Sequence, residues 1–183
     1  MKNLSRRDFL KIGGIGGVKA TGLSERQLPR LRLQSIGFVF QAYNLLGSLP
    51  AQENIEIVGQ LASANPSENR QKAEELLTML GLEDRMNHLP SDLSGGQKQR
   101  VTIVRALAND PPLILADEPT GNLDSKTRYE VMELLCCGLG RDKGRSIVIV
   151  THNLQLRDIA DRILWLEDGR LTHKEFVEET ISN

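Results

Sequence analysis

The 183-residue sequence is poor in cysteine and in aromatic residues, it is almost neutral, and it has no long apolar run. Its two cysteines, Cys136 and Cys137, are adjacent, which excludes a disulfide framework and a zinc site of spaced ligands. Aromatic residues make up 4% of the chain, which argues against a surface on which nucleic-acid bases stack. No apolar run approaches the roughly 18 residues that a membrane-spanning helix needs. The formal net charge of −1 likewise gives no overall signal for a nucleic-acid partner.

The composition that remains is that of a globular chain with a sizeable core. Hydrophobic residues make up 39% of the sequence and there are 16 glycines, which excludes a disordered or collagen-like chain. The charge is uneven, because residues 1–34 carry eight basic and two acidic residues. Within that basic region, Ser5–Lys11 resembles the twin-arginine motif of bacterial export signals. The apolar stretch after it is short and rich in glycine, so we expect residues 1–22 to be a disordered basic tail.

From Ser35 onward, short apolar runs alternate with helical patterns, which predicts an α/β organisation. Strands are predicted over residues 36–40, 113–116, 146–150 and 163–166, the last entering a hairpin turn at Asp168-Gly169. Helices are predicted after the capping residues Asn65, Ser94 and Asp124. The runs 113–116 and 146–150 are wholly apolar, as expected for strands that are covered on both faces.

A glycine pair marks the start of the helix predicted after Ser94. Residues 93–97 read Leu-Ser-Gly-Gly-Gln, and glycines let a ligand approach the backbone closely. The N–H groups in the first turn of a helix point outward with the positive end of its dipole, so this terminus suits an anion such as a phosphate. The alternative is an ordinary serine cap with glycine for flexibility.

Two carboxylates, Asp117 and Glu118, stand at the end of an otherwise apolar predicted strand. In open parallel sheets, ligands bind at the carboxyl ends of the strands. One carboxylate can hold Mg²⁺ there, and the next residue, which points the other way along the strand, can polarise an attacking water. The alternative is a solvated acidic pair before the turn at Pro119.

Two other strand ends carry polar side chains. Gln41 follows the first predicted strand, and its amide can reach a metal or a water. Thr151 and His152 follow the third, and the histidine can donate a hydrogen bond to a phosphate oxygen. Taken alone, such residues are more often a surface glutamine and a hydrogen-bonded structural histidine.

The order of these motifs along the chain carries a resemblance. The order is Gln41, Leu93–Gln97, Leu115–Pro119, Gly121–Asp124 and Thr151-His152. This order resembles the nucleotide-binding subunits of ATP-binding cassette (ABC) transporters, from about Leu23 to Asn183. Residues 37–46 are similar to the subgroup that serves lipoprotein release and macrolide export.

The resemblance implies catalytic and metal-binding roles for four residues. Gln41 would be the Q-loop glutamine, which touches Mg²⁺ or water and senses the membrane subunit. Asp117 would be the aspartate that holds Mg²⁺, and Glu118 would be the catalytic glutamate. His152 would be the switch histidine.

The resemblance also implies residues that bind the nucleotide. Ser94, Gly95, Gly96 and Gln97 would form the signature, which contacts the γ-phosphate of an ATP held by a partner subunit. Asp124 would lie at the seam of the dimer.

The fold implied by the resemblance is an incomplete P-loop NTPase fold of the ABC ATPase type, α/β with a mostly parallel sheet. Residues 23–183 would form the partial ATPase domain, with an inserted helical subdomain over about 42–110. The cofactors would be ATP and Mg²⁺, and the partners a transmembrane permease subunit and a second ATP-binding subunit, with no nucleic acid. The protein would be cytoplasmic and peripheral on the inner face of the plasma membrane.

The sequence departs from the family in one large respect, which concerns the Walker A loop. That loop has the pattern G-x-x-x-x-G-K followed by Ser or Thr, and the nearest segment, Gly13–Lys19, has Val18 before the lysine and Ala20 after it. The loop supplies the N–H groups and the lysine that neutralise the β- and γ-phosphates. We therefore expect the isolated chain to bind MgATP weakly and not to turn it over.

Three other interpretations remain open at this point. The chain can be a non-catalytic half-site partner that presents Ser94–Gln97 to a nucleotide held by a complete subunit. It can be a truncated or fused gene product. It can also be a soluble ABC ATPase of DNA repair or translation, although the residues around Gln41 argue against this.

The resemblance also implies a missing strand. In the family, one strand lies between the strands that match residues 146–150 and 162–166. Loss of that strand would leave an apolar strand edge and a poorly stable chain.

Overall fold

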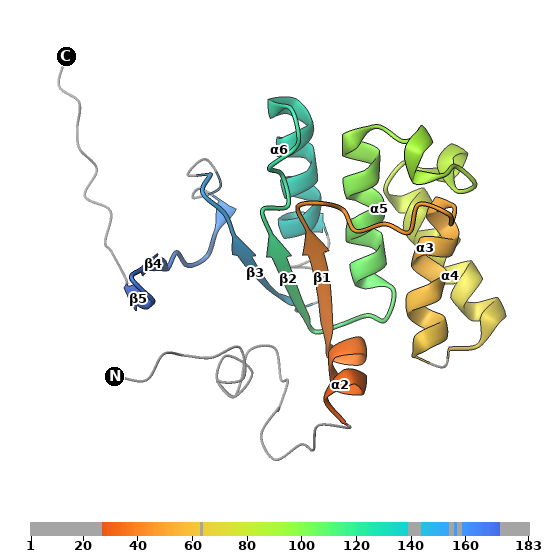
Figure 1. Ribbon diagram of the computed structural model, residues 1–183, viewed down its shortest axis with the longest axis horizontal. Coiled ribbons are helices and arrows are strands. Elements are labelled where there is room, and N and C mark those ends of the chain that lie inside the picture. The colour runs from red at the N-terminus through yellow and green to blue at the C-terminus, as the bar shows by residue number, and fades with distance from the viewer. Residues whose placement is uncertain (1–26, 63, 139–143, 154–155, 157–158, 173–183) are drawn as a thin grey trace.

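The computed structural model describes residues 27–62, 64–138, 144–153, 156 and 159–172 (Figure 1). Its centre is a parallel sheet of three strands in the order β1 (Ile36–Phe40), β2 (Leu113–Asp117) and β3 (Ser146–Val150). These are the first three predicted strands, with β2 one residue longer than expected. The predicted tail over residues 1–22 and the Gly13–Lys19 segment lie outside the described residues.

The register of the sheet brings its three strand ends to one level. Phe40 pairs with Asp117, and Asp117 pairs with Val150. Because all three strands run in the same direction, the residues that follow them leave the sheet at the same edge. The polar residues predicted to follow the three strands therefore lie at one edge of the sheet.

Two helices pack on one face of the sheet and form the main core with it. They are α5 (Gly95–Leu107) and α6 (Ser125–Glu133), which continues into a π-helical turn, η3 (Leu134–Gly138). The core joins Val39, Ile114 and Ala116 of the strands to side chains of both helices. At Gly37, α5 approaches so closely that a β-carbon would lie 2.3 Å from the carbonyl oxygen of Ala106. Only glycine lets this strand and this helix pack at that distance.

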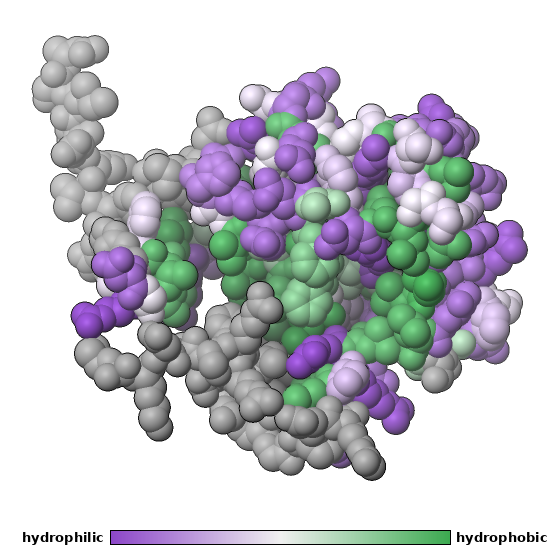
Figure 2. Space-filling view, in the orientation of Figure 1, coloured by the Kyte–Doolittle hydropathy of each residue, from purple (hydrophilic) through white to green (hydrophobic). Residues whose placement is uncertain are grey.

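The other face of the sheet is less covered than the sequence predicts. Strand alternation puts Phe38, Leu115 and Val148 on it, together with Val150, whose exposed fraction is 63%. The space-filling view shows apolar surface over the middle of the sheet (Figure 2). The prediction of cover on both faces holds for most of 113–116, where Leu115 alone is half-buried, but it is wrong for 146–150, all of which is half-buried or exposed. Apolar runs predict a strand, but they do not say which parts of the chain cover it.

A helical layer lies beside the sheet (Figure 1). It consists of α3 (Ala51–Leu61), α4 (Pro66–Met79) and the outer side of α5, which share a second apolar core. Helix α4 begins as predicted, because the Asn65 side chain accepts a hydrogen bond of 2.9 Å from the N–H of Ser67. The boundaries 42–110 of a helical subdomain stay a prediction.

The remaining elements are short. Helix α2 (Leu28–Ser35) leads into β1, and two 3-10 turns, η1 (Glu83–Arg85) and η2 (Pro90–Asp92), connect α4 to α5. Strands β4 (Trp165–Glu167) and β5 (Arg170–Thr172) form the predicted hairpin, with positive φ at both turn residues, Asp168 and Gly169. Strand β4 begins later than the strand predicted over 163–166. Within these described ranges, no helix is long and apolar enough to cross a membrane.

The outer edge of β3 leads to a prediction about the isolated chain. In the part of the chain that the structure describes, β3 pairs with β2 alone, and β4–β5 is a separate sheet. An apolar edge of this kind promotes association between chains. We expect the 183-residue chain to self-associate as its concentration rises and to melt over a broad range, measured by light scattering and circular dichroism. A monodisperse monomer with a sharp cooperative melt would contradict this.

Candidate functional site at the carboxyl edge of the sheet

The carboxyl edge of the sheet gathers most of the predicted catalytic residues. Gln41 follows β1, Asp117 ends β2 with Glu118 after it, and Thr151 and His152 follow β3. The backbone joins two of these ends directly, because the N–H of Glu118 donates a 2.9 Å hydrogen bond to the carbonyl of Val150. The structure thus brings Gln41, Asp117, Glu118 and His152 to one edge.

The side chain of Glu118 accepts three hydrogen bonds from the segment after β3. One carboxylate oxygen, Oε1, accepts hydrogen bonds from the N–H of His152 at 2.8 Å and from its ring Nδ1 at 2.7 Å. The other oxygen, Oε2, accepts the hydroxyl of Thr151 at 3.0 Å. The backbone of Glu118 is in the left-handed region, with φ of 43°, a strained conformation for a residue with a side chain. The carboxylate is therefore held in one orientation by the segment after β3.

These contacts change the acidity of Glu118. Desolvation acts to raise its pKa, but hydrogen bonds from the ring and N–H of His152 and from Thr151, with the charge of His152, outweigh it. The net effect holds the pKa of Glu118 below its ordinary value. Since the carboxylate is then ionised, the ring nitrogen Nδ1 of His152 must be the donor. The side chain of His152 is 83% exposed, which leaves the opposite nitrogen, Nε2, open to a ligand.

The lowered pKa predicts how stability depends on pH. A carboxylate whose pKa is lower in the folded state stabilises the fold above its unfolded value of about 4.3, and this stabilisation is lost as pH falls through the lowered folded value. We expect the wild-type chain to be more stable than Glu118→Gln at pH 6. Urea unfolding of both at pH 6 and pH 3 measures this difference, which should shrink at pH 3. A difference that stays constant would show that Glu118 is not preferentially ionised in the fold.

Gln41 is fixed to the loop that follows β2. Its carbonyl accepts a 3.0 Å hydrogen bond from the side-chain amide of Asn122. Its side chain lies against Gly121, where a β-carbon would come within 2.8 Å of Gln41 Nε2. This role of Asn122 was not predicted, although Asn122 stands within the Gly121–Asp124 motif. The role of the Thr151 hydroxyl was not predicted either, because its only sequence signal is the neighbouring histidine.

Asp117 and Gln41 suit a magnesium ion that brings most of its own ligands. Both side chains are exposed at the sheet edge and offer oxygen atoms. Among the described residues, no three His, Cys, Asp or Glu side chains form a group that could hold a metal ion by itself. Mg²⁺ keeps several waters and binds through one or two carboxylates together with phosphate oxygens, so this donor set fits it.

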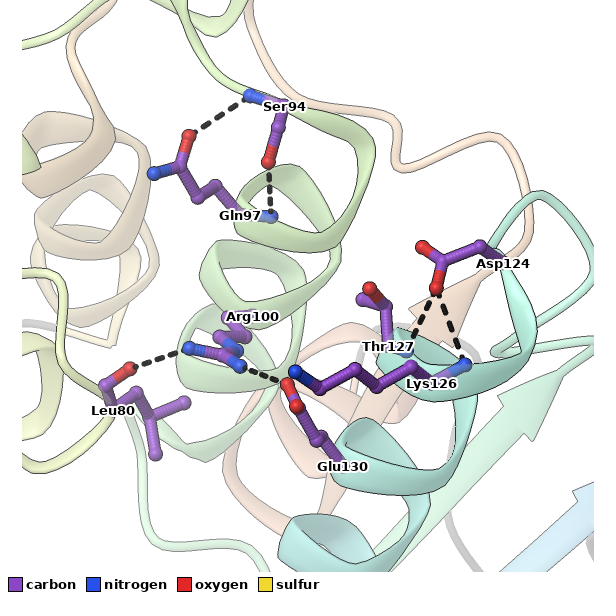
Figure 3. Close-up of polar contacts among 8 residues, drawn as sticks. All are labelled: Leu80, Ser94, Gln97, Arg100, Asp124, Lys126, Thr127 and Glu130. Atoms are coloured by element: carbon purple, nitrogen blue, oxygen red, sulfur yellow. Dashed lines mark hydrogen bonds and ion pairs between the residues drawn. The ribbon is translucent and has the colours of Figure 1, made fainter.

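The predicted signature forms the start of α5 (Figure 3). The Ser94 hydroxyl oxygen accepts a hydrogen bond from the N–H of Gln97 at 3.3 Å, and Gln97 Oε1 accepts one from the N–H of Ser94 at 2.9 Å. This is a capping box, so the ordinary reading of Ser94 as a helix cap is correct. The N–H groups of Gly95 and Gly96 lie outside that box, in the turn where a helix favours an anion.

The two glycines also serve the packing of the chain itself. A β-carbon on Gly96 would lie 2.5 Å from the Cγ2 atom of Thr127 in α6, and one on Gly95 would lie 3.2 Å from the hydroxyl of Tyr43. Close approach to a ligand is thus only one reason for the pair. The start of α5 is packed against the start of α6 and against the segment after Gln41.

Asp124 caps α6 (Figure 3). Its Oδ1 atom accepts hydrogen bonds from the N–H groups of Lys126 at 3.2 Å and Thr127 at 3.1 Å. Its hydrogen bonds with Thr127 lower its pKa, so the cap is ionised. The predicted capping role is confirmed, whereas the place of Asp124 at a dimer seam stays a prediction.

Comparison with known proteins gives one consistent result. The sequence profile of the family described as "ABC transporter" matches residues 15–121. The chain is 48% identical over 157 residues to an ABC transporter ATP-binding protein of Thermotoga maritima, covering 86% of this chain and 66% of that protein. It is 46% identical over 157 residues to the macrolide export ATP-binding/permease protein MacB of Bartonella henselae, covering 86% of this chain but 24% of MacB. The chain thus spans less than two thirds of the length of both relatives.

A solved structure gives the same fold. It is the dimeric, post-hydrolysis state of the ATP-binding cassette MJ0796 of Methanocaldococcus jannaschii, bound to ADP and Pi. The TM-score is 0.74 at 42% sequence identity, and the match covers 88% of this chain and 73% of that one. The predicted α/β fold of the ABC ATPase type is confirmed.

Proposed function

We propose that this chain, which belongs to the ABC transporter family, acts on ATP in a dimer with a second ATP-binding subunit. The observation that carries this proposal is the common level of three strand ends, which puts Gln41, Asp117, Glu118 and His152 at one edge of the sheet. The MacB relative is an export protein, which supports export as the process that ATP hydrolysis drives. Lipoprotein release is the alternative process.

The side chains of this edge are suited to activating a water molecule. Glu118 is ionised and held by Thr151 and His152, so it can accept the proton of a water in line with a phosphoryl group. When both ring nitrogens of His152 carry a proton, Nε2 can donate to a phosphate oxygen while Nδ1 donates to Glu118. Mg²⁺, held by Asp117 and Gln41, would neutralise charge on the transferred phosphoryl group.

The start of α5 is suited to the other side of a phosphate. Gly95 and Gly96 offer backbone N–H groups, and the capping box of Ser94 and Gln97 keeps that turn rigid. In the dimer, Ser94–Gln97 would face a nucleotide held by the second subunit, with Asp124 at the seam between the two.

The place of the chain in a transporter follows from the same proposal. A transmembrane permease subunit would be its second partner, contacted through the helical layer of α3 and α4. The chain would then lie at the inner face of the membrane as a peripheral subunit.

A complementation assay tests the proposal. The ATP-binding cassette of Methanocaldococcus jannaschii is made with aspartate at the position that aligns with Ser94, so that its homodimer lacks a working signature. Adding the 183-residue chain should restore MgATP hydrolysis, whereas the chain alone should show no turnover. Hydrolysis by the chain alone at the rate of an intact subunit would show instead that its own edge suffices. A mixture that forms dimers without gaining activity would contradict the proposal.

A further inference from the structure

The backbone directly after Gln41 adopts an unusual conformation. Tyr43 and Asn44 have φ values of 60° and 50°, which places two consecutive residues with side chains in the left-handed region. Such a conformation is strained and persists only where the surroundings hold it. Within the segment, the N–H groups of Tyr43 and Asn44 donate to Phe40 and Ala42 at 3.2 and 2.7 Å.

The surroundings that hold this segment belong to α5. The guanidinium group of Arg105 donates to two successive carbonyls, from Nη2 to Tyr43 at 2.9 Å and from Nη1 to Asn44 at 2.5 Å. The hydroxyl of Thr102 lies 3.3 Å from the Tyr43 carbonyl as well. Arg105 is partly buried, and this burial lowers its pKa. The guanidinium group is therefore partly desolvated, and the two carbonyls replace some of its water. The planar fork of arginine suits two neighbouring acceptors, which the single ammonium of lysine cannot match.

The two ends of the loop are anchored independently. Further along, the side chain of Asn54 in α3 accepts the N–H of Leu46 at 2.7 Å and donates to the carbonyls of Leu46, Leu49 and Pro50. Arg105 therefore holds the part next to Gln41, whereas Asn54 holds the part next to α3. Only the first of these anchors is on α5.

We propose that Arg105 is a positioning residue for Gln41, and that it couples the place of Gln41 to the start of α5. The coupling runs through the carbonyls of Tyr43 and Asn44 and along one continuous helix of 13 residues. At the other end of that helix, the Tyr43 hydroxyl lies against Gly95, so one residue contacts both ends of the path. The inference rests on the proposed role of Gln41 in the ATP site.

The test uses the full chain without nucleotide, in dilute solution. It measures local structure and not ATP hydrolysis, so its result does not depend on the ATPase assay. Residue-resolved hydrogen exchange follows the amides of Tyr43, Asn44 and Leu46, and the ¹⁵N-labelled side-chain amide of Gln41 gives a signal at the site itself. In Arg105→Gln we expect the Tyr43 and Asn44 amides to exchange at least about tenfold faster and the Gln41 signal to shift. The Leu46 amide, which Asn54 holds, should keep its rate.

Two variants serve as controls on the same elements. Arg100→Gln, also on α5, removes contacts to the Leu80 carbonyl and to Glu130 and should leave the Gln41 signal in place. Asn54→Ala should speed exchange at Leu46 without moving Gln41. Arg105→Lys should shift the Gln41 signal by an intermediate amount. This variant replaces Arg105→Gln in the test if Arg105→Gln does not fold. An unchanged Gln41 signal in a folded Arg105 variant, or equal acceleration of all three amides, would overturn the proposal.

Discussion

Ser94→Asp is expected to abolish the ATP hydrolysis that this chain restores in a mixed dimer. Aspartate caps a helix as well as serine does, so α5 should still begin at Gly95. Its negative charge, however, would repel the phosphate that the start of the helix faces. Loss of one well-placed donor to a developing charge lowers turnover by about 10²- to 10³-fold, and a repelling charge should reach at least that range. Steady-state phosphate release in the complementation assay measures the effect.

The matched control for this prediction is Ser94→Asn. Asparagine also caps helices well and carries no charge, so most of the restored activity should survive. Glu118→Gln in this chain should likewise leave it nearly intact, because the restored site uses the catalytic carboxylate of the partner. If Ser94→Asp were as active as Ser94→Asn, the start of α5 would not face the nucleotide.

Gly37→Ala is expected to have the largest effect on stability. A β-carbon at this position would lie 2.3 Å from the carbonyl oxygen of Ala106, a backbone atom of α5 that cannot turn aside. The strand and the helix must then move apart within the main core. Overpacking a core lowers the free energy of unfolding by about 1 to 3 kcal/mol, and we expect about 3 kcal/mol here because a backbone atom is the obstacle. Urea unfolding followed by circular dichroism measures the change.

Gly47→Ala is the control, since a β-carbon there would meet no atom within 4 Å. Its stability should stay within about 0.5 kcal/mol of the wild type. Equal losses in the two variants would mean that glycine is needed for chain flexibility at both positions. That result would contradict the close packing of β1 on α5.

The elements with strong local signals were predictable from the sequence, and α3 was not. Helices α4, α5 and α6 each begin at a side-chain cap that the sequence displays, at Asn65, Ser94 and Asp124. Helix α3 follows Pro50, has no side-chain cap and contains Gly59 and β-branched residues, all of which weaken a helical signal. It is stabilised by packing, since Ile55 and Ala51 are buried in the second core.

The candidate site was predictable in its residues but not in its contacts. Parallel strands of equal register explain why Gln41, Glu118 and His152 share an edge. The bond from Thr151 to Glu118 depends on the path of the chain after β3, which no pattern of residue types contains. The packing role of Gly96 was not predictable either. Its sequence context indicates a ligand, but the structure also requires glycine there because Thr127 packs against it.

A single labelling measurement tests whether the start of α5 faces a triphosphate held by another subunit. The mixed dimer is incubated with an ATP analogue that carries a photoreactive group on its γ-phosphate, and the labelled residues are identified by mass spectrometry. We expect label on this chain within Ser94–Gln97, and much less of it in Ser94→Asp than in Ser94→Asn. Label confined to the partner subunit, or placed on this chain far from residues 94–97, would show that the start of α5 does not face that triphosphate.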